Sequence, residues 1–187
     1  DFLTIRDTTI ITNKNRVVGV QSTTSFTAKS KATIRIHTVE YSSKYEITLV
    51  KGGTTYSAIC KTRAGDTAAN DADNTYFLSS KNILDDLRDG SESGDNEYAH
   101  TNAASGINGI SGITATIIGN TLELEGDTAF TVSVVGGRAG TALTSYQDTV
   151  DLISELPAES KHDRKVTINN TASAYDTYYV KFVATDG

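Results

Sequence analysis

This chain of 187 residues has no tryptophan or methionine and contains one cysteine and one proline. The single cysteine, Cys60, cannot form an intramolecular disulfide, which excludes a disulfide-stabilised small fold. No apolar run approaches the roughly 20 residues that a membrane-spanning helix requires. A domain of this size buries roughly 70% of its unfolded surface, so it needs neither a disulfide nor a structural metal to fold.

An excess of basic residues is also missing. The chain carries 23 acidic and 17 basic residues, for a formal net charge of −6. Proteins that bind nucleic acid usually carry clustered lysine and arginine, so we expect no specific nucleic-acid partner. The one basic cluster, Lys161–Lys165, is short and interrupted by Asp163. We interpret it as a solvated turn before a strand at Val166–Ile168.

Threonine is abundant and tyrosine occurs nine times, a composition typical of β-sheets. Apolar and polar residues alternate over 32–37 and 45–49. Gly52-Gly53 then predicts a tight hairpin leading into a strand at Tyr56–Cys60, since paired glycines supply the positive φ angles of such turns. Cys60 alternates in step with Tyr56 and Ala58, which favours a buried core residue over a reactive thiol.

One amphipathic helix is predicted at about 75–89. Asp73 or Asn74 is a natural N-cap and Gly90 a natural residue after the last turn. The apolar stripe consists of Tyr76, Ile83, Leu84 and Leu87, and we expect it to pack on a sheet. The polar, glycine-rich residues 91–112 that follow predict a long surface excursion.

Further strands are predicted at 113–118, 121–124, 130–135, 165–168 and 177–184. The fold class is therefore α+β and mainly β, with antiparallel sheets and one principal helix. Residues 1–31 are interpreted as strands and a linker that could belong to a neighbouring domain. Residues 32–187 are then one β-rich domain, and we expect the chain to be a fragment of a longer protein.

No catalytic, cofactor-binding or metal-binding residue is predicted. Asp66, Asp71 and Asp73 lack the central glycine and closing glutamate of a calcium-binding loop, so capping and solvated roles are favoured. The three histidines (His37, His100 and His162) stand in unrelated contexts, without a motif typical of a catalytic triad.

Two acidic side chains leave a hydrolase open as an alternative. Glu123 and Glu125 share one face of a predicted strand, as a pair of glycosidase carboxylates would. A solvated strand face is the commoner cause of such a pattern. The glycine-rich segment Val135–Gly140 lacks the spacing of a phosphate-binding loop and is interpreted as a hairpin or bulge.

An ordered set of motifs runs through most of the chain. A strand ends in an Asn-Arg pair, and a strand–turn–strand unit and an amphipathic helix preceded by Asp follow. The set closes on Leu-Pro, Val-x-Ile and Asp-x-Tyr-Tyr-Val-x-Phe. The matching segments are 10–18, 32–60, 73–87, 113–124, 156–157, 166–168 and 176–182. This order resembles the tail tubular protein B family, the tail nozzle proteins of short-tailed bacteriophages, although Glu40–Lys44 fills a turn where that family usually has glycine.

The resemblance implies a structural role and no enzymatic activity. Members of that family form rings, typically hexamers, that extend the tail tube below the portal and adaptor, help to anchor tail fibres and let DNA pass. The implied partners are the adaptor, the tail fibre and further copies of the chain, in a virion tail made in the host cytoplasm. An acidic balance suits a DNA conduit, because like charge keeps phosphate from adhering.

Two other functions stay open at this point. A host-surface module that binds glycans or a receptor could use the tyrosines and the segment 91–112 as a contact surface. The second is the cell-wall or capsule hydrolase that Glu123 and Glu125 would serve.

Overall fold

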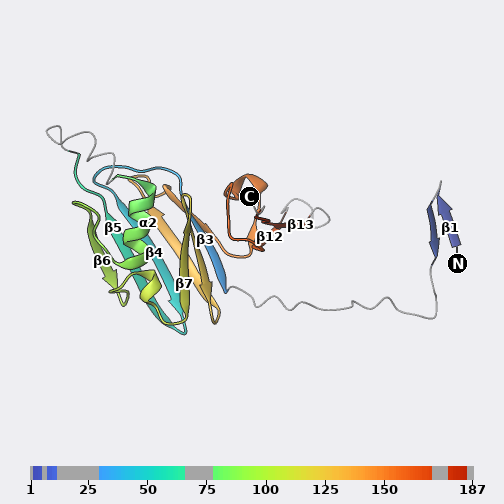
Figure 1. Cartoon of the computed structure of the whole chain (residues 1–187), viewed down its shortest axis with the longest axis horizontal. Coiled ribbons are helices and arrows are strands. Elements are labelled where there is room, and N and C mark those ends of the chain that lie inside the picture. The colour runs from blue at the N-terminus through green and yellow to red at the C-terminus, as the bar shows by residue number, and fades with distance from the viewer. Residues whose placement is uncertain (1, 6–7, 12–29, 66–77, 170–176, 185–187) are drawn as a thin grey trace.

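The structure is a computed structural model that describes residues 2–5, 8–11, 30–65, 78–169 and 177–184. It is mainly β with one principal helix, which confirms the predicted fold class. Two four-stranded antiparallel sheets form the main body, and a three-stranded sheet adjoins it (Figure 1). Strands β1 (Phe2–Ile5) and β2 (Thr8–Ile11) pair with each other.

The first sheet has the order β6-β5-β4-β9. It contains β4 (Lys44–Lys51), β5 (Thr54–Lys61), β6 (Glu97–Thr101) and β9 (Phe130–Gly136). The predicted hairpin between β4 and β5 is confirmed, with φ of 57° at Gly52 and 80° at Gly53. These positive angles are the reason that glycine occupies both turn positions.

The second sheet has the order β10-β3-β8-β7. It contains β3 (Lys31–Ile36), β7 (Ile113–Ile118), β8 (Thr121–Gly126) and β10 (Leu143–Tyr146). Strands β9 and β10 are consecutive in the chain but belong to different sheets. The glycine-rich segment 135–140 is therefore a turn between two sheets, and its interpretation as a hairpin was wrong.

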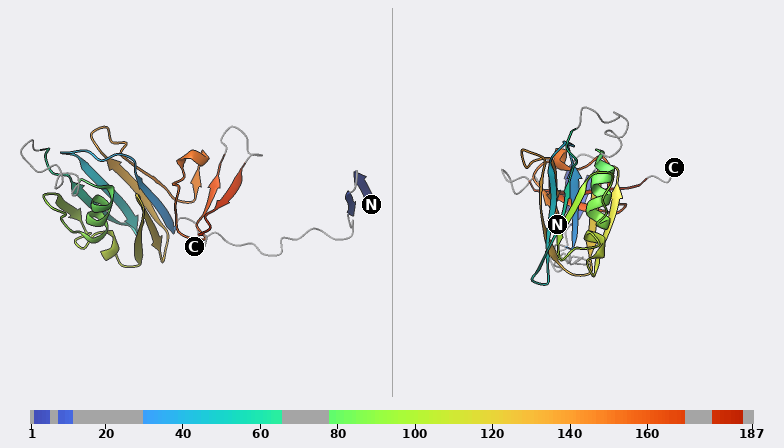
Figure 2. Two further views of the ribbon diagram at one scale, coloured as in Figure 1. Left: turned by 45° about the horizontal axis from the view of Figure 1, so that its top comes forward. Right: turned by 90° about the vertical axis from the view of Figure 1, so that its left-hand side faces the viewer.

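Helix α2 (Ser80–Asp89) contacts β4 and β5 of the first sheet and β7 of the second. Figures 1 and 2 show it lying beside both sheets, so that it closes the open side between them. Its buried Ile83, Leu84 and Leu87 join the inward faces of the strands in one hydrophobic core. The fully buried apolar strand residues include Ala32, Ile34, Tyr45, Ile47, Leu49, Ala58, Cys60 and Leu122.

The start of the helix was predicted wrongly. α2 begins five residues later than expected, and the Ser79 hydroxyl caps it by accepting a 3.1 Å hydrogen bond from the Asn82 N–H. Gly90 ends the helix in the left-handed conformation, as predicted. The proposed caps Asp73 and Asn74 and the stripe residue Tyr76 lie outside the described residues.

Residues 91–112 are not a surface excursion, which corrects that prediction. They contain β6, which pairs with β5, and a short 3-10 helix, η1 (Ile107–Gly109). Ala103, Ile107 and Ile110 from this segment are buried in the main core. Three apolar side chains scattered among polar residues have no periodicity, and so the sequence pattern did not reveal them.

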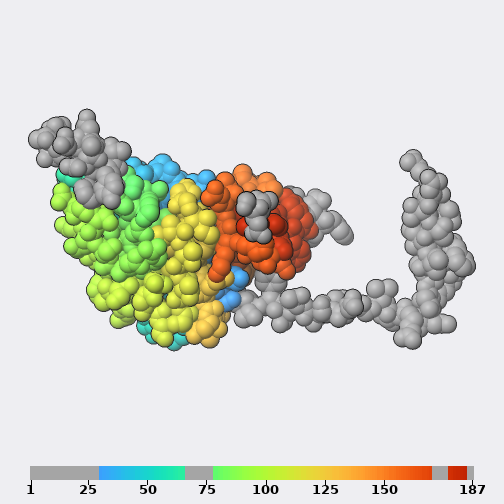
Figure 3. Space-filling view, in the orientation of Figure 1, coloured from blue at the N-terminus to red at the C-terminus, as the bar shows by residue number. Residues whose placement is uncertain are grey.

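The third sheet has the order β11-β12-β13, and Figure 3 shows this C-terminal part beside the main body. Its strands are β11 (Thr149–Val150), β12 (Lys165–Ile168) and β13 (Tyr178–Lys181), with the 3-10 helix η2 (Ile153–Glu155) after β11. Val150, Val166 and Ile168 form a separate small core. The predicted boundary at residue 31 adjoins residues outside the described part and stays a prediction.

Candidate interaction groove

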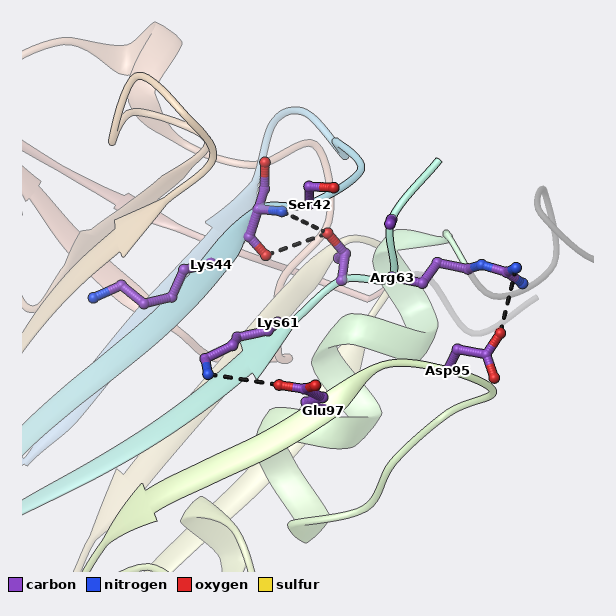
Figure 4. Close-up of a pocket in the computed structure, with 9 residues that line it drawn as sticks. Ser42, Lys44, Lys61, Arg63, Asp95 and Glu97 are labelled. Carbon is purple, nitrogen blue, oxygen red and sulfur yellow. Dashed lines mark hydrogen bonds and ion pairs between the residues drawn. The ribbon is translucent and has the colours of Figure 1, made fainter. Parts of the chain in front are cut away.

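An open groove of about 600 Å³ lies at one end of the first sheet, where β4 begins, β5 ends and β6 begins. Its charged lining residues are the cations Lys44, Lys61 and Arg63 and the acids Asp95 and Glu97. Figure 4 shows these side chains around the groove, with Lys61 directed to Glu97 and Arg63 to Asp95.

The two lysines are placed by strand register. Lys44 on β4 lies opposite Lys61 on β5, and Lys61 lies opposite Glu97 on β6. Like charges directly opposite on a sheet repel each other, so each lysine needs an acidic partner. Lys61 Nζ lies 3.5 Å from Glu97, and Lys44 Nζ lies 2.7 Å from Glu46. The hydrogen bond from Lys44 is the main reason that the pKa of Glu46 is lowered.

Arg63 is the least exposed cation of the groove, with 13% of its side chain accessible. Its Nη2 lies 3.3 Å from Asp95, whose own side chain is 73% exposed. The Arg63 N–H donates a 3.2 Å hydrogen bond to the amide oxygen of buried Asn96. Arg63 therefore holds Asp95 through its side chain and Asn96 through its backbone N–H, and these two residues directly precede β6.

The hydroxyls of Thr62 and Ser43 bond to the backbone of residues 40–43, which form part of the groove wall. Thr62 Oγ1 donates to the Glu40 carbonyl at 2.6 Å and accepts from the Ser43 N–H at 3.0 Å. Ser43 Oγ lies 3.1 Å from the Tyr41 carbonyl, to which it donates. Ser43 Oγ also donates a 3.3 Å hydrogen bond to the Glu40 carboxylate. Both hydroxyls are thus engaged in holding residues 40–43, and what the groove offers to a partner is a set of fixed charges of both signs.

Glu123 and Glu125 do not form a pair of catalytic carboxylates. Glu123 is 3% exposed, accepts a 2.8 Å hydrogen bond from Thr33 Oγ1 and also accepts one from Ser160. Glu125 forms ion pairs with Lys31 and Lys161, and the hydrogen bond from Lys161 lowers its pKa. A glycosidase general acid needs a raised pKa, so Glu125 has the opposite property.

The other residues considered from the sequence are dispersed. His37 lies 2.7 Å from Thr144 Oγ1, His100 stacks on Tyr98 with ring centroids 5.8 Å apart, and His162 contacts Asp163. Within the part of the chain that the structure describes, no three His, Cys, Asp or Glu side chains gather as metal ligands would. Asp66, Asp71 and Asp73 lie outside that part.

Cys60 is buried, as predicted, and its thiol points to Asp86 on α2. Burial is the main cause that raises the pKa of this thiol, and the charge of Asp86 raises it further. A protonated, buried thiol is a packing residue.

Lys161–Lys165 was interpreted as a solvated turn, which was wrong for Arg164 because its side chain is buried. Arg164 has only 3% of its side chain exposed and donates a hydrogen bond to the Gln147 carbonyl. Its Nε lies 4.0 Å from Glu123, and its guanidinium lies over the Tyr146 ring at 5.9 Å. Arg164 thereby joins the C-terminal sheet to the outer face of the second sheet, a role that a local charge pattern does not reveal.

The groove residues were missed by sequence reasoning, although part of the signal was present. The hairpin at Gly52-Gly53 fixes the register of β4 and β5, and extending that register places Lys44 opposite Lys61. Asp95 and Glu97 could not be found in the same way, because the sequence pattern assigned them to a loop.

Comparison with known proteins identifies the class as a phage tail structural protein. A family model described as bacteriophage nozzle protein matches residues 1–187, and the chain belongs to this family. No curated protein matches the chain. The family places the chain in the virion tail, in association with other tail proteins, as the motif order in the sequence indicated. Among the described residues there is no helix with the length and apolar character to cross a membrane.

Proposed function

We propose that this chain forms part of the wall of a phage tail nozzle, where it assembles with further copies of itself, with the adaptor and with the tail fibres around a passage for DNA. Its work is structural and not enzymatic, and its synthesis takes place in the host cytoplasm before assembly. The observation that carries this proposal is the nozzle family match over residues 1–187.

The chemistry of the groove supports a protein partner over a small substrate. Three cations and two acids line it, and its Ser43 and Thr62 hydroxyls are engaged by the backbone. Fixed charges of both signs on a polar surface provide specificity and orientation between proteins. A charged face of a neighbouring tail protein is therefore the occupant that we infer for the groove.

The glycan-binding alternative has less support, because residues 91–112 contribute to the core and the sheet. The Tyr98 ring is partly buried, and its hydroxyl donates a 2.6 Å hydrogen bond to the Ala103 carbonyl. Tyr98, the tyrosine of this segment, therefore does not present its whole ring for stacking on a sugar.

Cryo-electron microscopy of the virion that carries this chain tests the proposal. We expect density for the two four-stranded sheets and α2 in the tail, below the portal and around the DNA path. Absence of this density from the tail would overturn the proposal.

A second test concerns the groove. Lys44→Glu combined with Lys61→Glu reverses two exposed cations of the groove, and we expect phage complemented with this variant to assemble incomplete tails. Lys31→Glu with Lys81→Glu is the matched control, because it makes the same charge change at exposed sites elsewhere. Normal tails with both variants would exclude the groove as an assembly surface.

A further inference from the structure

The C-terminal sheet exposes more large apolar side chains than it buries. Its core contains three fully buried residues, Val150, Val166 and Ile168. The same part of the chain exposes Leu152, Ile153, Tyr178, Tyr179 and Val183, which are 47–69% accessible. These side chains form two groups, one at η2 and one at β13, and charged residues adjoin each group.

One face of this sheet is aromatic and basic where β12 and β13 pair. The β12–β13 register places Lys165 opposite Lys181 and Thr167 opposite Tyr179, so these side chains share a face. Tyr179 is 69% exposed and both lysines are exposed. Asp163 lies 2.5 Å from Lys181, which leaves this face with one acid and two lysines. We call Lys165, Tyr179 and Lys181 the β13 surface.

The segment that follows the edge strand β11 is aliphatic and acidic. Leu152 and Ile153 follow β11 and are 60% and 58% exposed, and Asp151 and Glu155 flank them in the chain. Both acids are exposed, and the Glu155 carboxylate accepts a 3.2 Å hydrogen bond from the Asp151 N–H. We call Asp151, Leu152, Ile153 and Glu155 the η2 surface.

The two surfaces are separate, because the β13 surface lies on β12 and β13 whereas the η2 surface follows β11, the edge strand farthest from β13. They are complementary in chemistry, since one combines an aromatic ring with two lysines and the other combines two aliphatic side chains with two carboxylates. Strand β13 also has a hydrogen-bonded neighbour on one side only among the described strands. Two different patches of one chain that complement each other generate head-to-tail contacts, which close into rings when the rotation permits.

We propose that copies of this chain associate head to tail through the C-terminal sheet, with the β13 surface of one copy bound to the η2 surface of the next. Tyr179 packs against Leu152 and Ile153 of the neighbour, and the two lysines pair with Asp151 and Glu155. A second copy is the occupant because both complementary halves belong to this chain. The inference rests on the proposed self-assembly and assigns its surfaces.

Sedimentation velocity of the full chain over a range of concentrations tests this assignment with two charge-reversed variants. One carries Asp151→Lys and Glu155→Lys, and the other carries Lys165→Glu and Lys181→Glu. The native chain is expected to associate, and each variant alone is expected to associate at least tenfold more weakly. Because the reversed surfaces complement each other, mixing the variants in equal amounts restores association. All four positions are exposed, and circular dichroism verifies that both variants fold.

The control variant Lys31→Glu with Lys81→Glu is expected to associate like the native chain. If the native chain stays monomeric at every concentration, the proposed self-assembly fails together with this inference. If it associates but the charge-reversed variants associate equally well, self-assembly stands and the surface assignment is overturned. Weak association of each variant without recovery in the mixture also overturns the direct pairing of these two surfaces.

Discussion

The hydroxyl of Ser93 donates a 2.7 Å hydrogen bond to the carboxylate of Asp86, which lies on α2 and has no exposed surface. Ser91 donates to the same oxygen at 3.0 Å, and the Asn96 amide donates to the other oxygen at 3.2 Å. A buried carboxylate is tolerated when hydrogen-bond donors replace its water. These three bonds hold residues 91–96 against α2 and so position the start of β6 at Glu97.

Asp86→Ala should therefore destabilise the fold by about 2 kcal/mol, because it leaves buried Asn96 and half-buried Ser93 without their acceptor. Urea denaturation measures this loss. The matched control is Asp85→Ala on the same helix, which removes only ion pairs with Lys81 and Arg88 at the surface. That change should cost less than about 1 kcal/mol. Equal losses from both variants would contradict the assigned role of Asp86.

The thiol of Cys60 should not react in the native protein. It is 0% exposed, and its pKa is raised chiefly by burial. Reaction with a thiol reagent requires an accessible thiolate. At pH 8 we expect no labelling of the folded chain over minutes and complete labelling in guanidinium chloride. Rapid labelling without denaturant would show that α2 does not cover this strand.

Two glycines with positive φ should respond differently to alanine. Gly90 has φ of 68°, and a Cβ there would lie 2.6 Å from the backbone N of Gly106. Gly52 has φ of 57° and open space around that position. Gly52→Ala should cost about 1 kcal/mol from the backbone conformation alone. Gly90→Ala should cost clearly more, because backbone atoms must also move, and thermal unfolding of the two variants compares them.

Arg164→Met should loosen the C-terminal sheet selectively. The substitution leaves Glu123 buried without its nearby cation and removes the bond to the Gln147 carbonyl. Breaking a buried charge pair on one side costs about 3 kcal/mol. Hydrogen exchange should show faster exchange in β12 and β13, with β4 and β5 unchanged. Glu159→Gln, at an exposed position before the same turn, should leave exchange in both regions unchanged.

Glu125 should contribute stability that disappears in acid. Its pKa is lowered from 4.5, mainly by Lys161 and then by Lys31. A carboxyl group with a lowered folded-state pKa stabilises the fold above its unfolded pKa, and this contribution is lost as the pH falls through the folded value. The difference in unfolding free energy between the native chain and Glu125→Gln should be constant well above pH 4.5, at less than about 1 kcal/mol. It should vanish once the pH has fallen below the lowered folded-state pKa. A difference that grows in acid would contradict this sign.

Much of the fold could be predicted from local patterns, because hairpin turns and helix ends depend mainly on the residues that form them. The β4–β5 hairpin follows from two glycines that permit positive φ, and the last turn of α2 follows from the apolar stripe and Gly90. The start of α2 was misplaced because Asp73, Asn74 and Ser79 are all acceptable caps by type. Which one is used depends on packing.

The candidate groove was not predictable to the same degree. Its lysines could be paired from the hairpin register, but Asp95 and Glu97 reach the groove only because β6 pairs with β5. The segment that contains β6 reads as polar and irregular. Its strand forms because Ala103, Ile107 and Ile110 anchor the following residues in the core.

The sequence by itself determined the mainly β class, the hairpin, the helix and the family, since alternation, glycine placement and motif order are properties of the chain. Only the tertiary structure decided that Arg164 is buried against Glu123 and that Glu125 is an ion-pair residue. It also decided that Lys165 and Lys181 lie with Tyr179 on one face of the C-terminal sheet, where β12 pairs with β13. These relationships join residues far apart in the chain, and their energies depend on burial and distance, which no local pattern specifies.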